Sequence, residues 1–532
     1  MGTVREALHN VLEEASNNEW SEFDLAAACY AELRRYVVSD SLFLASYTQP
    51  AHMQITGDGV PSQNPNLAQL EDLRSSFART LIDMRNGRLR RADAYQAMWK
   101  GCESISLIPF INDQLSESTL LWTIIQAVDQ LAVLDEHFES ADYHGPMNEL
   151  ACKDRVGVYT SRQIGRTSPT LFDDMRITHI PEQHFNDQLD SLVFIERHGS
   201  APLPNLVTIR SADANYNSEI GSIRIGLEFF TGANIYGTDE SNTLVRIHPG
   251  PANSFTITYG EGYDSHFTSL VHQSIRGAIN HRCDILVFPE ILISPKLLQE
   301  IRTYLKRPEV RDRLKLVVAG STWYHDIQEH AGQNVSTILN GRGSILGTTH
   351  KRDPFIYKMK RGTAKLALTE AIFDTECKRT VVDVSGIGRI AVSICKDTVS
   401  DDRESIDLVR DIKANIMLVP AFSDSIQRGF YLPFTVLAER GLAVACLSNY
   451  CGACIAHEKD SSKVEIGYVF APEAGEGNPR QAHSNPITFY RNEECKRQCI
   501  DEFKSGNPQS CLHVVEIRKD DEDAGLTIEQ IA

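Results

Sequence analysis

A short apolar run at residues 285–288 is followed directly by Pro289 and Glu290. The run, Ile-Leu-Val-Phe, has no polar member and includes β-branched residues, which is typical of a strand buried on both faces of a sheet. Pro289 has no N–H to donate to a sheet ladder, so the strand is predicted to end there. Glu290 therefore lies just beyond a buried strand, where a carboxylate is costly unless it is partnered or has a chemical role.

Strand-like and helical segments alternate on both sides of this run. Strands are predicted at 206–209, 223–230, 255–259 and 314–319, and helices at 266–281 and 297–305. Strands interleaved with helices predict a layered α/β architecture. Periodicity alone does not separate a doubly wound sheet from two packed sheets.

The N-terminal part of the chain has a different pattern, because apolar residues recur there at helical spacing and Ser21 is predicted to cap a helix. We predict four regions. They are a mostly helical domain at 1–150, a mixed connecting region at 151–205, an α/β domain at 206–515 and an acidic C-terminal tail at 516–532. A chain of 532 residues is too long for one ordinary core.

Two further segments end in residues that suit nucleophilic chemistry. The strand-like run 388–394 ends at Cys395, and the segment 344–350 leads into Lys351. A glutamate, a lysine and a cysteine, each at the edge of a predicted strand, are the groups required for nucleophilic attack on a carbon–nitrogen bond. Taken singly, each is more often a surface charge or a core thiol, so the prediction rests on the three together.

Longer motifs around these residues resemble those of the nitrilase, or carbon–nitrogen hydrolase, superfamily. In chain order they are 286–290 around the glutamate, 334–351 leading to the lysine, 388–397 around the cysteine, then 414–422 and 438–452. Several short motifs in one order are far more specific than any one of them. The resemblance implies a four-layer αββα sandwich in this part of the chain, and it does not extend to the first 200 or so residues.

The resemblance also implies a role for each site residue. Cys395 would be the nucleophile, Glu290 the general base, and Lys351 the electrophilic partner of the charge that develops on the substrate. Glu370, nineteen residues after Lys351, is similar in position to a second glutamate that many members place beside the lysine. Glu376 is a near competitor for that position.

The chemistry of a cysteine explains why such partners are needed. A free thiol has a pKa near ~8.5, so little of it is thiolate at neutral pH. Glu290 can take the proton, pass it to the departing amine and later activate water against a thioester. The Lys351 ammonium and the backbone N–H of Lys396 are candidate donors to the tetrahedral intermediate. The side chain of Lys396 would also depress the pKa of Cys395 or attract a substrate carboxylate.

The predicted function is hydrolysis of a carbon–nitrogen bond other than a peptide bond, in a small amide, nitrile or carbamoyl compound, through a thioester or thioimidate. An amide is preferred over a nitrile because most branches of the superfamily cleave amides. The alternative is a small-molecule sensor or scaffold, in which the helical domain binds a partner. A glutaminase that feeds ammonia to a synthetase is disfavoured, because the chain has no nucleotide-binding signature.

Composition excludes several other classes of function. With 42% hydrophobic and 23% charged residues the chain is of the ordinary globular type, and its formal charge of −18 disfavours binding to nucleic acid. No apolar run approaches the 18 or so residues that span a bilayer. The N-terminus is unlike a signal peptide, so a cytoplasmic location is expected. No cofactor is implied.

Two questions concern metal binding and assembly. Cys451, Cys454, Cys495, Cys499 and Cys511 are spaced so that four of them could bind zinc, although only the first pair has a standard spacing and buried thiols are preferred.

The segment 430–442 is predicted to be a helix, and it has more apolar positions than a single narrow face of a helix requires. A homodimer, or a larger even oligomer, built through the nitrilase-like domain is therefore expected.

Overall fold

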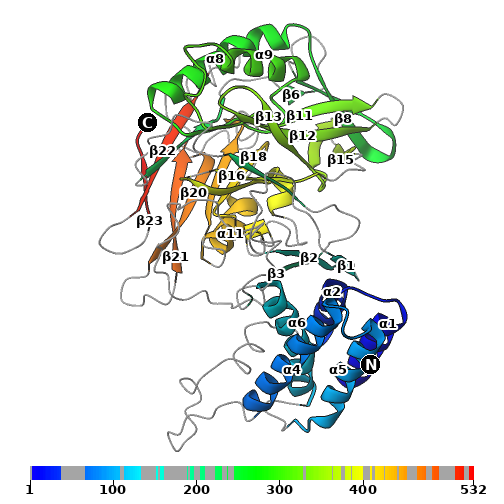
Figure 1. The fold of residues 1–532 in the computed structure, drawn as a ribbon. Helices are drawn as coiled ribbons and strands as arrows, with labels where there is room; N and C mark the ends of the chain where they lie inside the picture. Colours follow the sequence, from blue (N-terminus) through cyan, green and yellow to red (C-terminus); the bar gives the residue numbers. More distant parts are fainter. Residues whose placement is uncertain are drawn as a thin grey trace, which may run out of the picture. The chain divides into compact units, whose positions relative to one another are not determined.

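The computed structural model in Figure 1 describes most of the chain. The described residues are 3–37, 66–107, 113–133, 151–153, 156–160, 189, 192–196, 204–209, 222–230, 236–237, 245–326, 331–361, 364–372, 378–384, 386–399, 408–409, 412, 414–423, 426–439, 443–451, 464–474, 482–490, 510–519 and 526–532. They form two compact units, one within Met1–Gly165 and Pro181–Ser200, the other within Arg166–Ile180 and Ala201–Ala532.

The first unit is built from helices that share one apolar core. Its helices are α1 Val4–Asn17, α2 Glu22–Tyr36, α4 Leu67–Arg85, α5 Arg91–Ser104 and α6 Asp113–Val133. The cap predicted at Ser21 is confirmed, because the Ser21 hydroxyl accepts from Asp24 N–H and the Asp24 carboxylate accepts from Ser21 N–H. Helix α6 is buried on several sides, with Trp122 fully enclosed.

A small antiparallel sheet belongs to this unit as well. Its strands are β1 Ala151–Lys153, β2 Val156–Thr160 and β3 Leu192–Glu196, in the order β1-β2-β3. Val156, Val158 and Phe194 enter the helical core, where the Phe194 ring stacks on Tyr30 at 4.7 Å between centroids. Part of the predicted connecting region 151–205 therefore packs with the helices, so the helical unit extends beyond residue 150.

The second unit contains two large sheets packed face to face (Figure 1). The eight-stranded sheet has the order β11-β12-β10-β9-β5-β22-β23, with β13 paired to β12. Its strands are β5 Ser222–Glu228, β9 Ile285–Val287, β10 Leu316–Val318, β11 Thr322–Asp326, β12 Ala331–Asn340, β13 Ile345–His350, β22 Leu512–Lys519 and β23 Leu526–Gln530.

The seven-stranded sheet has the order β21-β20-β19-β18-β17-β16-β4. Its strands are β4 Asn205–Ile209, β16 Thr380–Val384, β17 Gly388–Val392, β18 Ile416–Ala421, β19 Val444–Asn449, β20 Glu465–Ala474 and β21 Ala482–Tyr490. Side chains of both sheets meet in one buried core, with Ile285 and Val287 from one sheet and Ile390 and Leu418 from the other.

Helices cover the outer faces of the two sheets. Helices α8 Tyr263–Asn280 and α9 Pro295–Leu305 share a second core with Leu286 and Val317 of the eight-stranded sheet. Helix α11 Ile426–Glu439 packs on β20 and β21 of the seven-stranded sheet. The layers are therefore helix, sheet, sheet and helix, which confirms the predicted αββα sandwich.

Strand β9 shows why this stretch of sequence has no polar member. Ile285 and Val287 point into the core between the sheets, whereas Leu286 points into the core under α8 and α9. The strand is paired on both sides, with β5 and β10 as parallel neighbours. The buried strand predicted before Pro289 is thus confirmed, and Glu290 follows its end.

A third sheet, with the order β14-β15-β8-β7-β6, was not predicted as a unit. Its strands are β6 Tyr236–Gly237, β7 Val245–Pro249, β8 Ser254–Tyr259, β14 Ile356–Arg361 and β15 Ala364–Glu370. The last residue of β15, Glu370, is paired with Phe255 of β8. This sheet therefore fixes the backbone position of Glu370.

The prediction of an acidic C-terminal tail at 516–532 is wrong. Strand β22 pairs with β5 along its length and β23 pairs with β22, so the C-terminal residues complete the eight-stranded sheet. Val515 and Ile517 are fully buried, and the Glu516 carboxylate between them is paired with Arg224 and Arg518. The alternation of apolar and charged residues is that of a strand, but it is short and lies beside a charge-rich run.

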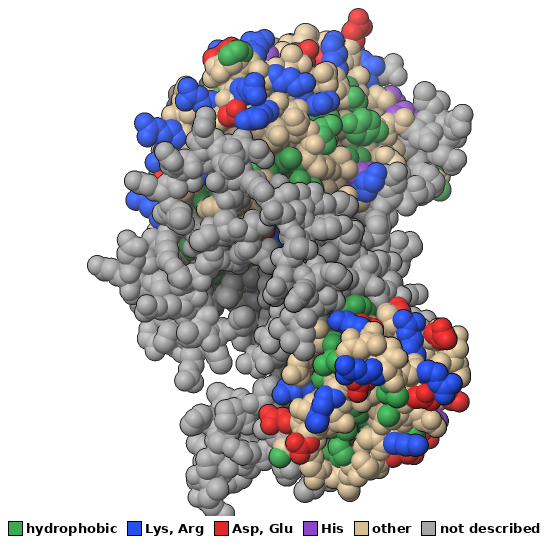
Figure 2. Space-filling model, in the orientation of Figure 1, with side chains coloured by type: hydrophobic (Ala, Val, Ile, Leu, Met, Phe, Trp, Pro, Cys, Tyr) green, Lys and Arg blue, Asp and Glu red, His purple; other side chains and the backbone are tan. Residues whose placement is uncertain are grey.

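Figure 2 shows charged side chains of both signs on the described surface of each unit. Of the described helices, none combines the length and apolar character needed to cross a membrane.

Candidate active site

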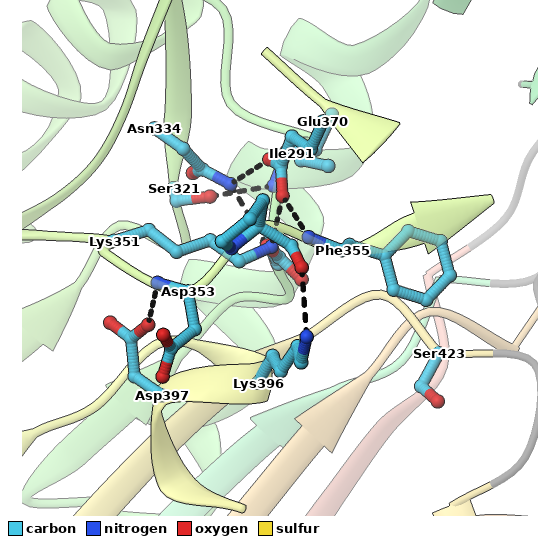
Figure 3. Close-up of polar contacts among 12 residues, drawn as sticks. Ile291, Ser321, Asn334, Lys351, Asp353, Phe355, Glu370, Lys396, Asp397 and Ser423 are labelled. Atoms are coloured by element: carbon cyan, nitrogen blue, oxygen red, sulfur yellow. Dashed lines mark hydrogen bonds and ion pairs between the residues drawn. The ribbon is translucent and has the colours of Figure 1, made fainter. Parts of the chain in front are cut away.

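The structure brings Glu290, Lys351, Glu370 and Cys395 together at the ends of strands from three sheets. Figure 3 shows Lys351, Glu370 and Asn334 of this site. Glu290 follows β9 and Lys351 follows β13, both in the eight-stranded sheet. Glu370 ends β15 of the five-stranded sheet, and Cys395 begins a short 3-10 turn, Cys395–Thr398, after β17. Residues separated by as many as 105 positions thus share one buried site.

Lys351 lies between two carboxylates. Its Nζ is 2.7 Å from Glu290 Oε1 and 2.6 Å from Glu370 Oε2, and all three side chains are almost completely buried. The cluster holds one cation and two possible anions away from water. Because a buried charge is expensive, such a cluster requires that each group be hydrogen-bonded.

Asn334 of β12 completes this cluster and was missed as a site residue, although it lies within the motif that leads to Lys351. Its Nδ2 donates to Glu290 Oε1 at 2.9 Å and to Glu370 Oε1 at 3.0 Å. Its carbonyl oxygen accepts from the Lys351 N–H at 2.8 Å. One side chain therefore holds both carboxylates while its backbone holds the lysine. No spacing rule in the sequence points to this bridge.

Cys395 has a strained backbone. Its φ is +47°, in the left-handed region that residues other than glycine seldom adopt, and the side chain is 3% exposed. The Glu290 carboxyl and the backbone N–H of Phe422 are close enough to the thiol to change its pKa in opposite directions. Strain of this kind persists only where the surroundings over-determine it, and it gathers at functional sites.

The loop that carries Glu290 is also fixed by hydrogen bonds. Ile291 has φ +69°, and its N–H donates to Ser321 Oγ at 2.9 Å. The hydroxyl of Tyr259 donates to Ile291 O at 2.9 Å. Gly320, with φ +51°, lies so close that a Cβ there would collide with the carbonyl of Pro289. The carboxylate is therefore presented by a rigid loop.

The environment assigns a protonation state to each group. Burial raises the pKa of the Glu290 carboxyl against the effect of the Lys351 ammonium, and the Glu370 carboxylate adds to the rise. Burial acts to lower the pKa of Lys351, but the two carboxylates hold it well above its ordinary value. Burial and Glu290 raise the pKa of Cys395 well above that of a free thiol, with Lys351 opposing. The resting site thus holds an ammonium and a neutral thiol, and a base must take the thiol proton during attack.

Lys396, predicted as a supporting residue, lies beside this cluster. Its side chain is half-buried, and its Nζ donates to the carbonyl of Pro354 at 3.1 Å. Among the described residues this is the ammonium's one hydrogen bond, which leaves two donors. Lys396 is thus a cation next to the nucleophile in the chain, and two of its ammonium hydrogens are available to a ligand.

Asp397 and Arg379 were not singled out from the sequence. Asp397 lies in the same turn as Cys395, and its carboxylate accepts from the N–H groups of Arg352 and Asp353 at 3.1 and 2.8 Å. Arg379 donates to Asp397 Oδ2 at 3.2 Å and also to the carbonyl of His350. The turn of the nucleophile is thereby joined to the segment of the lysine.

The described part of the chain contains no group of three or more histidine, cysteine or acidic residues that could hold a metal ion. Cys451 is buried, and Cys511 is half-buried with its Sγ 3.5 Å from His513 Nε2. Cys454, Cys495 and Cys499 lie outside the described residues. The possibility of zinc at these cysteines therefore stays untested.

No family model and no curated protein matches the chain. Solved structures do show a likeness. One is a double mutant of an amidase from Nesterenkonia sp. AN1 in complex with acrylamide, at 14% identity and a TM-score of 0.33, which covers 58% of this chain and 95% of the amidase. Another is Nit3 from Saccharomyces cerevisiae, a member of branch 10 of the nitrilase superfamily, at 17% identity and a TM-score of 0.31, which covers 53% and 96%.

A third is a glutamine-dependent NAD+ synthetase from Acinetobacter baumannii in complex with ADP, at 14% identity and a TM-score of 0.33. It covers 58% of this chain and 48% of the synthetase. A little more than half of this chain is therefore similar to structures that include nitrilase-superfamily amidases, and any function for the chain has to be argued from the site described above.

Proposed function

We propose that the chain is a hydrolase of carbon–nitrogen bonds other than peptide bonds, with Cys395 as nucleophile and a small amide, nitrile or carbamoyl compound as substrate. One observation supports this most. A buried lysine is shared by two carboxylates, and one of these, Glu290, lies close enough to the buried thiol of Cys395, on a strained backbone, to raise its pKa. Replacing such a cluster by apolar residues would often stabilise a fold, so stability alone does not account for it.

The proposed reaction of an amide begins with attack of Cys395 Sγ on the carbonyl carbon. Glu290 takes the thiol proton as the carbon–sulfur bond forms, and the charge that develops on the carbonyl oxygen is met by Lys351 and the Lys396 N–H. Of the three ammonium hydrogens of Lys351, the described contacts occupy two, which leaves one for the substrate. This geometry is suited to stabilising charge that appears only in the transition state.

Glu290 then returns the proton to the departing nitrogen, and ammonia or an amine leaves behind a thioester on Cys395. A water molecule loses its proton to Glu290 and attacks the thioester, which releases a carboxylic acid and restores the thiol. Glu370 accepts from Lys351, Asn334 and the Phe355 N–H, so its oxygens are occupied and its proposed role is to hold Lys351. An amide is preferred over a nitrile on the family resemblance.

The test measures ammonia release from amides, nitriles and carbamoyl compounds of matched structure. Intact-protein mass spectrometry is used alongside it to detect an acyl adduct on Cys395. Cys395→Ala should abolish turnover, by a factor on the order of 10⁴ or more, as expected for loss of a nucleophile. Cys446→Ala is the matched control, because Cys446 is an equally buried thiol in β19. Turnover that survives in Cys395→Ala would refute the proposal, and ligand binding without turnover in the intact chain would favour the sensor instead.

We also propose that the chain works as a homodimer or a larger even oligomer through α11. The inner side of this helix is buried, as at Phe434 and Leu437, but Leu432 is 71% exposed and Tyr431 is 45% exposed. Large apolar side chains grouped on one helix face are more often covered than left in water. Light scattering that gives a single 59.5 kDa species at micromolar concentration would refute this assembly. A cytoplasmic location and the absence of a cofactor stay predictions.

A further inference from the structure

The segment 350–354, which contains Lys351, is held along its backbone by side chains from the other large sheet. Oδ1 of Asp397 accepts from the N–H groups of Arg352 at 3.1 Å and Asp353 at 2.8 Å. These are the two peptide groups that follow Lys351. Figure 3 shows Asp397 beside Asp353 on the edge of the cluster.

Arg379 holds the same segment on the other side of Lys351. Its guanidinium donates to the carbonyl of His350, the residue before the lysine, and to Asp397 Oδ2 at 3.2 Å. Arg379 directly precedes β16, and both side chains of the pair are no more than 3% exposed. Together the pair contacts the backbone on both sides of Lys351 from outside its own sheet.

Asp397 lies two residues after Cys395, within one 3-10 turn. Any shift of this turn therefore moves the nucleophile and the lysine segment together. The N–H of Lys351 donates to Asn334 O at 2.8 Å and adds a third point of attachment. The backbone of the lysine segment is thus tied to the turn of Cys395, whereas Glu290 and Glu370 hold the ammonium at the end of the Lys351 side chain.

A second buried ion pair shows that not every such pair has this arrangement. Asp383 of β16 and Arg389 of β17 are also 3.2 Å apart and no more than 3% exposed. Arg389 donates to Asp383 and to the carbonyl of Ile412, whereas Arg379 donates to Asp397 and to the carbonyl of His350. The two pairs are alike in charge, burial and distance, and they differ in what they hold.

We propose that Asp397 and Arg379 form a positioning pair that keeps Lys351 at its working distance from Cys395, an inference that rests on the proposed hydrolase function. The two residues do not touch the reacting atoms. They act through the backbone of the lysine segment, and a displacement of about 1 Å in such a group costs about 10²-fold in rate.

The experiment compares matched variants of the full chain. The first set is Asp397→Asn alone and together with Arg379→Gln, and the control set is Asp383→Asn alone and together with Arg389→Gln. The double variants remove both buried charges, so they leave no unpaired ion to impair folding as the single variants can. Urea unfolding, kcat and KM for the best amide substrate are measured for every variant.

We expect the two sets to lose similar stability, whereas only the Asp397 set should lose kcat, by about 10²-fold with KM changed by less than about threefold. A third variant, Arg379→Lys, keeps the charge but loses the planar fork of the guanidinium. It should therefore retain more of the parent rate than the double variant of Asp397 and Arg379 does. The inference is overturned if the Asp397 set retains the kcat of the parent chain, or if the control set loses kcat to the same extent.

A second readout needs no substrate. Alkylation of Cys395 by iodoacetamide is followed against pH by peptide mass. The groups that face the thiol are the Glu290 carboxyl, the Lys351 ammonium and the Phe422 N–H, and of these Lys351 and Phe422 favour the thiolate. If Lys351 moves away, the alkylation profile shifts to higher pH in the Asp397 set and not in the control set.

The two readouts separate the possible failures. A parent chain that neither releases ammonia from any amide nor forms an adduct on Cys395 refutes the hydrolase proposal. The alkylation profiles then still decide the positioning role, because superimposable profiles in the parent and the Asp397 set refute it.

Discussion

The helical unit and the sandwich unit bury charge in different ways. In the helical unit, Glu22 is 8% exposed and bonded to Arg85 Nε at 3.0 Å, and Asp129 is 5% exposed and accepts from the N–H of Leu192 at 2.7 Å. Each acid joins one element to another, α2 to α4 and α6 to β3. In the sandwich unit, Glu290 and Glu370 share one lysine beside a thiol.

This difference distinguishes buried acids that join two elements of the fold from buried acids that have a role in the reaction. An acid whose partner lies in a neighbouring element ties the two elements together, and nothing more is needed to explain it. A cluster with more possible anions than cations is unfavourable for stability, so its presence calls for another reason.

The largest effect on stability should come from removing the shared cation. Lys351→Met leaves Glu290 and Glu370 facing each other without a counter-ion, so the free energy of unfolding should fall by about 3–5 kcal/mol. The rate should also fall by about 10²–10³-fold from the loss of the donor to the intermediate. Arg85→Met is the matched change in the helical unit, and it should cost less because Arg85 is 29% exposed. Urea unfolding of both variants tests this, and equal losses would remove the distinction between the units.

Substitutions of the two carboxylates, Glu290 and Glu370, should lower the rate by different amounts. Glu290→Gln removes the base and should lower kcat by about 10²–10⁴-fold, whereas Glu370→Gln should have the smaller effect. Glu290 must be ionised to take a proton, and its pKa is raised mainly by burial. Activity of the parent chain should therefore fall as the pH falls through this raised value, above the ordinary range of a glutamate. A pH–rate profile without this fall at low pH, or a profile that is unchanged in Glu290→Gln, would count against Glu290 as the general base.

Lys396 should affect the choice of substrate more than the reaction itself. If its spare donors meet a substrate carboxylate, Lys396→Met should lower kcat/KM for an amide with a terminal carboxylate by roughly fivefold, the value expected of a partly exposed ion pair worth up to about 1 kcal/mol. A neutral amide of the same length is the control and should be hydrolysed as before. Equal losses for both substrates would indicate that Lys396 acts through its bond to Pro354 instead.

The smallest effect should come from the helical unit. Ser21→Ala removes the capping box of α2 and should lower the stability of this unit by about 1 kcal/mol without a change in kcat. Tryptophan fluorescence during urea unfolding reports mainly on this unit, because three of the four tryptophans, Trp20, Trp99 and Trp122, belong to it. A fall in kcat in this variant would show that the helical unit influences the site.

Much of the sandwich was predictable because its signals are local. The run before Pro289 predicts a buried strand that ends at Glu290, and the runs before Lys351 and Cys395 place those residues in the same way. The C-terminal strands were not predictable from pattern, because Val515 and Ile517 are too few to separate a strand from a charged tail. Their burial depends on β5, which lies almost 300 residues earlier in the chain.

Local sequence decides which groups stand at strand ends, since apolar runs, proline and turn residues act on their near neighbours. Tertiary structure decided which of these groups meet. The pairing of β15 with β8 places Glu370 at the lysine, the register of β12 with β13 places Asn334 between the two carboxylates, and the packing of the two large sheets brings Asp397 to the lysine segment. Contacts of this kind are long-range, and no local pattern of residues encodes them, because they depend on how the whole chain pairs and packs.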